Sequence, residues 1–356
     1  MALGLPCSNE MVKLLAMRTR CKSKQEAWIL IPVYEDWDAL QTLLLQINGL
    51  SGQWRFKVLL INDHALPPPG NWLTTPPPGS ITSIHILLLC RNVGHQRAIA
   101  LGLCHWWRQC FQGPVVIMDG DGEDQPSDIM RLLEAAQASD WLNIVFAERR
   151  KRSENWVFRL GYHAYRYVHI CLTGIPVRFG NFSVLSASHI KALIHQSELW
   201  NHYAAAVIRS KLSYDSIPTA RGNRLAGRSR MNLAGWVSHG LSALSIYSDI
   251  MGTRVLLAAM TGFGLSLLSL IIMCLFASGT GAVSAYYGIV ISLIVATIFV
   301  QAIAASLLFL FMVLGGRASA TFIPVRDGAI LTGEEYAIWQ ADEVQLNNEG
   351  PPDDAP

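Results

Sequence analysis

Two long stretches without a charged residue limit what this chain can fold into. The first runs for 23 residues from Val255 to Ala277, and the second for 36 residues from Gly281 to Gly316. As helices these stretches are at least about 35 Å long, more than the roughly 30 Å needed to cross the hydrocarbon core of a bilayer. The linker between them, Ser278 to Val283, is short and contains glycine. The pattern predicts an antiparallel hairpin of two membrane spans, with both flanks on the same side.

Charge and cysteine placement predict which side that is. Arginines flank the hairpin at Arg221, Arg224, Arg228, Arg230 and Arg254 before it, and at Arg317 and Arg326 after it. Positive charge near span ends marks the cytoplasmic side, and the first 30 residues lack the apolar core of a signal peptide. Seven scattered cysteines without a Cys-x-x-Cys motif suit free thiols in a reducing compartment. We therefore expect a two-span integral membrane protein whose larger part faces the cytoplasm.

Apolar runs alternate with helical patterns before the hairpin, at about 28–34, 56–61, 81–90, 114–118 and 142–147. This alternation is typical of an α/β domain with a mostly parallel, Rossmann-like sheet and helices on its faces. We expect five regions: an N-terminal extension at 1–26, the α/β domain at 27–220, a basic juxtamembrane segment with an interfacial amphipathic helix at 221–254, the two spans at 255–316, and a cytoplasmic tail at 317–356 with a disordered end. A net charge of +2, with no basic stripe interleaved with aromatics, predicts no nucleic-acid partner.

Polar clusters follow four of the expected strands. They are Tyr34-Glu35-Asp36, Asn62-Asp63-His64, Arg91-Asn92 with Gly94-His95-Gln96, and Asp119-Gly120-Asp121. Any one of them alone could be a helix N-cap. In open α/β sheets, however, ligands bind at the carboxyl ends of the strands, so four clusters favour a ligand site at that edge. The chain has neither a dinucleotide-binding glycine fingerprint after the first strand nor a P-loop.

The acidic cluster at Asp119, Asp121 and Glu123 carries the strongest chemical signal. Carboxylates this close after a buried strand destabilise one another as charges unless a cation is present. Their hard oxygens suit Mg²⁺ or Mn²⁺, which would bridge to substrate phosphates and neutralise a departing diphosphate. The alternative is a solvated acidic loop.

Four motifs follow one another along the chain: Pro32-Val33-Tyr34 with Asp36, Asn62-Asp63, Asn92 with Gly94, and the Asp119/Asp121 pair. As an ordered set they resemble the motifs of inverting family 2 glycosyltransferases with a GT-A fold. The basic segment and the hairpin resemble the branch that makes dolichyl- and polyprenyl-phosphate mannose or glucose. This resemblance implies a membrane-bound enzyme that moves a sugar from a nucleotide-sugar donor to a lipid acceptor, most simply a polyprenyl phosphate. It covers about residues 28–316.

The resemblance also implies roles for single residues. Asp36 and Asp63 would hold the base and ribose, Asp119, Asp121 and Glu123 the metal, and Asp121 with Arg149 would act in catalysis beside the diphosphate. The implied nucleotide-sugar site is Pro32, Tyr34, Asp36, Asn62, Asp63, Asn92, His95, Gln96, Asp119 and Gly120. The implied acceptor site is Arg159, Asn181, Arg228 and Arg230, although positive-inside placement alone would explain several arginines.

The sequence departs from the family pattern where relatives carry Gly-Asp-Phe-Arg, because here it reads Gly180-Asn181-Phe182-Ser183. A lipid phosphate is already ionised and needs no general base. A hydroxyl acceptor would need a general base to remove its proton, and Asn181 cannot act as one. Transfer to a hydroxyl of another lipid or of a growing glycan therefore stays open. A non-catalytic scaffold that binds nucleotide sugars is a further alternative. A homo-oligomer is also possible, since Gln301 in the second span could make a subunit contact.

Overall fold

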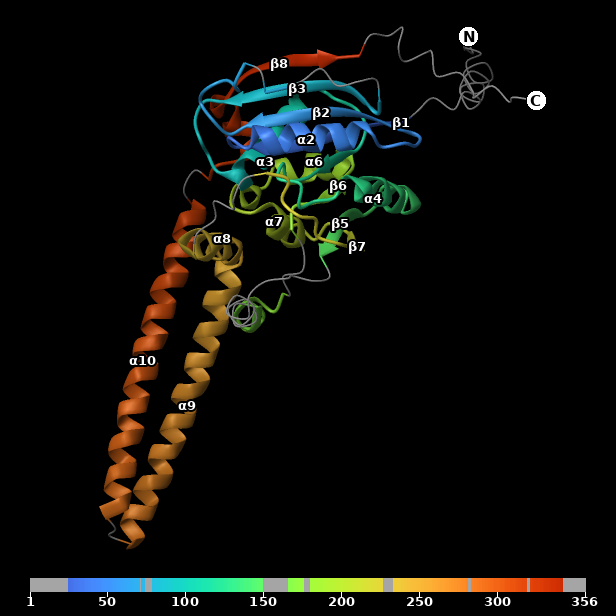
Figure 1. Ribbon diagram of the computed structural model, residues 1–356. Coiled ribbons are helices and arrows are strands. Elements are labelled where there is room, and N and C mark those ends of the chain that lie inside the picture. The colour runs from blue at the N-terminus through green and yellow to red at the C-terminus, as the bar shows by residue number, and fades with distance from the viewer. Residues whose placement is uncertain are drawn as a thin grey trace, which may run out of the picture.

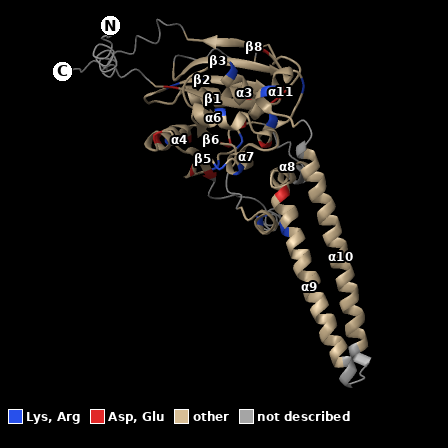
Figure 2. Cartoon of the chain, turned by 180° about the vertical axis from the view of Figure 1, so that it is seen from behind, with Lys and Arg blue, Asp and Glu red and all other residues tan. Residues whose placement is uncertain are grey.

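The computed structural model describes residues 25–70, 72–73, 79–149, 166–175, 180–226, 233–280, 283–318 and 321–341. It consists of an α/β domain joined to a long pair of antiparallel helices (Figure 1). Most of the expected N-terminal extension and the expected disordered end of the tail lie outside the described residues. Charged residues gather on the α/β domain and are nearly absent from the helix pair (Figure 2).

The domain contains one sheet of eight strands in the order β7-β5-β6-β4-β1-β2-β3-β8. The strands are β1 (Gln25–Val33), β2 (Trp54–Asn62), β3 (Ile81–Leu89), β4 (Val115–Ile117), β5 (Ile144–Arg149), β6 (Ser183–Leu185), β7 (Tyr214–Thr219) and β8 (Thr332–Gln340). The central pairs β4-β1, β1-β2 and β2-β3 are parallel, as is β5-β7. Strand β6 runs antiparallel between β4 and β5, and β8 runs antiparallel to β3 at the edge. The predicted mostly parallel sheet is confirmed.

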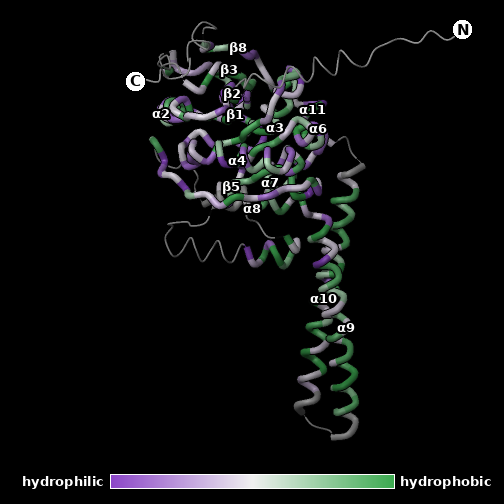
Figure 3. The backbone as a smooth tube through the Cα atoms, turned by 90° about the vertical axis from the view of Figure 1, so that its right-hand side faces the viewer, coloured by the Kyte–Doolittle hydropathy of each residue, from purple (hydrophilic) through white to green (hydrophobic). Residues whose placement is uncertain are grey.

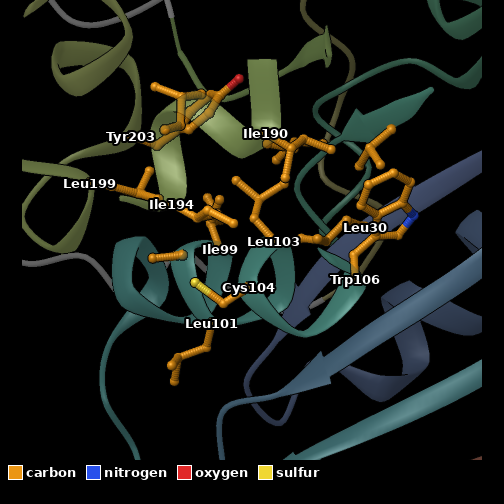
Figure 4. Close-up of a cluster of buried hydrophobic side chains, with 14 of the residues drawn as sticks. Leu30, Ile99, Leu101, Leu103, Cys104, Trp106, Ile190, Ile194, Leu199 and Tyr203 are labelled. Carbon is orange, nitrogen blue, oxygen red and sulfur yellow. The ribbon is translucent and has the colours of Figure 1, made fainter. Parts of the chain in front are cut away.

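Helices cover both faces of this sheet, because successive residues of each central strand point to opposite faces. One face packs against α2 (Trp37–Asn48) and α4 (Pro126–Ala138). The other packs against α3 (His95–Arg108), α6 (Ala187–Ile194), the 3₁₀ turn η2 (Ser197–Trp200) and α7 (Tyr203–Arg209). On that second face Ile99 and Leu103 of α3 meet Ile190 and Ile194 of α6 across a fully buried core (Figure 4).

The helix pair consists of α9 (Ser248–Thr280) and α10 (Val283–Ala318), preceded by α8 (Leu233–Ser245). Two stretches, Ser248–Phe276 and Tyr286–Gly316, are long and apolar enough to cross a membrane, with mean hydropathies of 2.3 and 2.5. In an 18-residue apolar segment of each stretch only 11% of the residues are buried, which argues against two core helices of a soluble protein. The pair is hydrophobic along most of its length (Figure 3), and many of its large apolar side chains are exposed. The two apolar helices predicted from the sequence are therefore present.

The structure differs from the expected single helix between residue 231 and Arg254. Helix α8 ends at Ser245 and α9 begins at Ser248, so Arg254 belongs to the first long helix. The break lies at Tyr247, whose buried ring docks on the domain and whose hydroxyl donates to the Ala205 carbonyl at 3.0 Å. This anchor fixes the point at which the long helix leaves the domain.

The chain returns to the sheet after the hairpin, through α11 (Pro324–Asp327), the 3₁₀ turn η3 (Gly328–Leu331) and β8. The Glu335 carboxylate of β8 accepts a hydrogen bond from His85 Nδ1 and another from His105 Nε2, each at 2.8 Å. Part of the expected tail is thus an ordered strand of the domain. Both flanks of the hairpin consequently lie at the same end of it.

Candidate active site at the carboxyl edge of the sheet

The parallel pairing brings the predicted polar clusters to one edge. Val33 at the end of β1 is in register with Asn62 at the end of β2, and Leu30 of β1 with Ile117 of β4. The Asp63 N–H continues this pairing by donating to the Val33 carbonyl at 2.8 Å. The segments that follow β1, β2, β3 and β4 therefore meet above the same edge, as expected for a ligand site in an open α/β sheet.

Asp63 fixes the turn that leads into α3. Its carboxylate accepts the Val93 N–H at 2.7 Å and the Gly94 N–H at 2.9 Å. Gly94 has a φ of +92°, a conformation that a side chain would strain. Burial raises the pKa of Asp63, although the two amides lower it in part. Asn62 is likewise committed to a loop, because its side-chain amide donates to the Leu66 carbonyl at 2.8 Å.

His95, at the start of α3, lies between two of the predicted site residues. Its Nε2 is 3.1 Å from Asp119 Oδ1 and 2.9 Å from the amide nitrogen of Asn181. Gln96 extends the chain of contacts, because its amide donates to Asn181 Oδ1 at 3.1 Å and its oxygen accepts the Tyr203 N–H at 2.7 Å. Burial alone would lower the pKa of His95, but the nearby aspartates, chiefly Asp119, raise it above its ordinary value.

The acidic loop, residues 119–124, is folded by its own carboxylates. Asp121 Oδ1 accepts the Glu123 N–H at 3.0 Å, and Asp124 Oδ2 accepts the Asp119 N–H at 3.0 Å. Gly122 has a φ of +83°, which the turn requires. Burial raises the pKa of Asp121, and the negative charges of Asp119 and Glu123 add to that rise even though the Glu123 amide opposes it.

A segment from the far side of the domain crosses this loop. We call residues 221–226 the arginine strap. Arg224 pairs with Asp36 Oδ2 at 2.8 Å through one terminal nitrogen and with Asp121 Oδ2 at 3.3 Å through the other. Arg221 Nε donates to Glu123 Oε2 at 2.9 Å. The backbones are joined as well, because the Leu225 N–H donates to the Asp121 carbonyl at 3.0 Å.

The strap was not predicted from the sequence, in which Arg221 and Arg224 were interpreted as the positive flank of the hairpin. Their partners lie 98 to 188 residues earlier in the chain, so no local pattern relates them. The only available signal was the excess of arginine over what two span ends require. In the structure these two guanidinium groups neutralise carboxylates of the candidate metal site.

The fit of a metal to this site can be judged from its donors. Within the described part of the chain, no three His, Cys, Asp or Glu side chains converge on a common point. Each of the three candidate carboxylates instead meets a basic side chain: Asp119 meets His95, Asp121 meets Arg224, and Glu123 meets Arg221. Hard carboxylate oxygens are the donors that Mg²⁺ and Mn²⁺ prefer, but in this arrangement the three carboxylates are paired with basic side chains and form no ligand set.

The remaining predicted residues are distributed as follows. Pro32 lies in β1, and the half-exposed Tyr34 ring follows it, 5.8 Å from the His64 ring. Asn92 is exposed beside the turn before α3. Gly120 packs so close to Ile31 that a Cβ atom at position 120 would lie 3.2 Å from Ile31 Cγ2. Arg149 ends β5, but its side chain is not described. Arg159, Arg228 and Arg230 lie outside the described residues.

No family model matches the chain. Among curated proteins it is similar to undecaprenyl-phosphate 4-deoxy-4-formamido-L-arabinose transferases from several bacteria. The one from Sodalis glossinidius is 30% identical over 131 residues, which are 36% of this chain and 38% of the relative. The one from Klebsiella pneumoniae is 28% identical over 134 residues, which are 37% of this chain and 38% of the relative. The one from Erwinia tasmaniensis is 26% identical over 156 residues, which are 43% of this chain and 46% of the relative.

Among solved structures, a mycobacterial protein has a TM-score of 0.41 at 14% identity, over 70% of this chain and 80% of that one. TarS from S. aureus has a TM-score of 0.34 at 10% identity, over 65% of this chain and 40% of that one. Both scores are too low to establish a shared fold. The sequence matches span less than half the length of the curated relatives. Over that length the chain is similar to undecaprenyl-phosphate sugar transferases, which confirms the resemblance predicted from its strand-end motifs.

Proposed function

We propose that this chain is a membrane-bound inverting glycosyltransferase that moves a sugar from a nucleotide-sugar donor to a polyprenyl phosphate. The observation that carries the proposal is the meeting of Asp36, His95, Asp121 and the arginine strap at one edge of the sheet. The names of the relatives support a polyprenyl-phosphate acceptor, and the two apolar helices support a membrane location. The arginines around the hairpin support a cytoplasmic orientation of the domain.

The donor would bind across the ends of β1 and β2. The Tyr34 ring gives an apolar face for a base, and the Asp36 carboxylate gives an acceptor for ribose hydroxyls. Asp63 acts through the backbone, because it holds the turn that aims α3 and His95 at the site. Since Arg224 already pairs with Asp36, donor binding exchanges one partner of that carboxylate for another.

Asp119, Asp121 and Glu123 would hold Mg²⁺ or Mn²⁺, which when bound supplies Lewis-acid stabilisation of a departing diphosphate. Arg224 and Arg221 then turn from these carboxylates to the diphosphate, because a guanidinium fork matches phosphate oxygens as well as carboxylate oxygens. Arg149, at the end of β5, would add positive charge on the same side. The strap would thus exchange its carboxylate partners for the diphosphate of a bound donor.

The acceptor phosphate would attack the anomeric carbon as the bond from that carbon to the diphosphate oxygen breaks. One displacement inverts the configuration and releases a nucleoside diphosphate. Asn181 cannot take a proton, and its amide is committed to His95 and Gln96. An acceptor that is already ionised fits this site better than a hydroxyl does. The arginines at 159, 228 and 230 remain candidates for capturing its phosphate.

The test is mass spectrometry of the lipid fraction after the purified full-length protein is incubated with undecaprenyl phosphate and a panel of nucleotide sugars. We expect a glycosylated polyprenyl phosphate and a nucleoside diphosphate, and no product from Asp121→Asn with an unchanged melting temperature. Undecaprenol, which lacks the phosphate, is the matched control acceptor. A product on undecaprenol alone would favour a hydroxyl acceptor. Donor binding with neither transfer nor donor hydrolysis would favour a non-catalytic scaffold.

A further inference from the structure

In the helical residues 166–173, two polar side chains are buried and three apolar side chains are exposed. His169 and Thr173 are only 1% and 3% exposed, whereas Tyr167, Val168 and Ile170 are 71%, 47% and 39% exposed. A helix on the surface of a water-soluble domain normally has the opposite arrangement, with apolar side chains against the core. The exposed face of this helix is therefore suited to a non-aqueous surrounding.

The two buried polar side chains, His169 and Thr173, both make contacts within the protein. His169 Nδ1 lies 2.9 Å from the Ile175 carbonyl, and the His169 ring meets the Tyr247 ring edge-on at 6.1 Å. The Thr173 hydroxyl donates to the His169 carbonyl at 2.7 Å and accepts the Ile175 N–H at 3.1 Å. The hydrogen bonds close the end of the helix, and the ring contact with Tyr247 joins it to the junction of α8 and α9. The orientation of the apolar face is consequently fixed.

Contacts with α9 set the depth of this helix. Arg254 donates to the carbonyl of Cys171 at 3.1 Å, and Gly174, with a φ of +76°, ends the helix against the same guanidinium. Arg254 is six residues into α9, or about 9 Å along it. The uncharged run begins at the next residue, Val255. The helix therefore lies where the hydrocarbon layer would begin.

The length of the first candidate span agrees with that depth. Its 29 residues, Ser248–Phe276, would extend about 43 Å, against about 30 Å for the hydrocarbon core and 40–45 Å with the headgroup layers. The first turns of α9, and the helix at 166–173 beside them, then fall in the headgroup layer. Figures 1 and 3 show this helix beside the upper part of α9 and lying across the direction of the spans.

We propose that the face formed by Tyr167, Val168 and Ile170 is a membrane-contact surface that inserts at the boundary between headgroups and acyl chains. The helix contains Arg166 and no acidic residue, and tyrosine and arginine are favoured at that boundary. The exposed apolar surface continues onto α9, where Val255 and Leu257 are 41% and 58% exposed. The face binds the bilayer as a second anchor beside the hairpin and holds the domain at a fixed height. This inference rests on the proposed membrane span of the hairpin.

The test is photo-crosslinking of the full-length protein in vesicles of phosphatidylethanolamine and phosphatidylglycerol. The photoreactive amino acid p-benzoylphenylalanine replaces Val168 in one variant and Leu45 in another, because these two side chains are equally exposed, at 47% and 46%. Leu45 lies on α2, remote from the hairpin (Figure 1). A third variant carries the same group at Phe311 of α10, which is 68% exposed and reports on the span itself.

We expect lipid adducts at positions 168 and 311 and a several-fold lower yield at position 45. A lipid adduct at 311, with a yield at 168 no higher than at 45, would overturn the contact surface and leave the hairpin in the membrane. A protein adduct at 168 to a second copy of the chain would also overturn it. The absence of lipid adducts at 311 would overturn the membrane span and this inference with it.

Discussion

Removing Arg224 should tighten the binding of a divalent cation to the acidic loop while it slows transfer. The guanidinium holds Asp121 at 3.3 Å and Asp36 at 2.8 Å, so it competes for the carboxylate that a cation would use. In Arg224→Ala the Asp121 charge loses that partner. The incoming cation then no longer has to displace it.

The size of the effect follows from the geometry. Opposite unit charges about 4 Å apart attract by about 4 kcal/mol at an effective dielectric constant of about 20. The Arg224 and Asp121 side chains are 19% and 20% exposed, so solvent screening and side-chain entropy reduce this to about 1–2 kcal/mol. That corresponds to about a 5- to 30-fold increase in the association constant for Mn²⁺. Transfer should fall, because the same guanidinium is proposed to meet the diphosphate.

The assay is a titration of the full-length protein with Mn²⁺ in detergent micelles, in which free Mn²⁺ is followed by its electron paramagnetic resonance signal. Arg209→Ala is the matched control, because Arg209 forms a two-point pair with Asp249 at 3.1 and 2.7 Å and both side chains are about a quarter exposed. It should lower the melting temperature and leave Mn²⁺ affinity unchanged. An Arg224→Ala protein that is folded and binds Mn²⁺ no more tightly than wild type would refute the competition.

Three further outcomes are expected. Glu335→Gln should destabilise the pairing of β8 by about 1.5–3 kcal/mol, because the single oxygen of a neutral amide cannot replace the two carboxylate oxygens that contact His85 and His105. Amide hydrogen exchange across β8 should therefore become faster than in the control Glu334→Gln, which changes an exposed neighbour, and equal protection in both variants would contradict the role of Glu335. Stability should fall as the pH drops through about 6.5, the ordinary pKa of histidine, because burial lowers the pKa of His189 and the unfolded chain therefore binds the proton first. The melting temperature should depend less on pH in His189→Asn than in wild type, and parallel curves would rule this out. On oriented vesicles, protease should reach the α/β domain and β8 from the same side, and opposite accessibility would refute the hairpin.

The sequence was sufficient to predict the centre of the fold because each central parallel strand is a local apolar run. Strand β8 could not be predicted in this way, since it pairs with β3 across about 250 residues that include both long apolar helices. Strand β7 reads as polar and contains Pro218, and β6 has three residues. Local pattern is weak wherever a strand is short, lies at an edge, or depends on a distant partner.

The candidate site divides along the same line. Strand ends carry the polar clusters, and parallel pairing brings strand ends together, so the position of the acidic loop at the carboxyl edge of the sheet could be predicted from the sequence. The charges that neutralise this loop could not, because Arg221 and Arg224 have no fixed spacing from it. Asp63 is a related case. Its residue type suited a contact with the donor, while the structure commits its carboxylate to two backbone amides.

The two departures from the family pattern, Asn181 and Ser183, make sense together. Ser183 is fully buried, with its hydroxyl 2.7 Å from the Tyr203 hydroxyl and donating to the Asn181 carbonyl at 2.9 Å. An arginine at 183 would bury its charge among these groups, and an aspartate at 181 would add a negative charge beside His95 and Asp119, so restoring either residue alone is costly. A neutral amide at 181 adds no further charge beside His95 and Asp119 and supplies no base. The proposed phosphate acceptor needs no base, because it is already ionised.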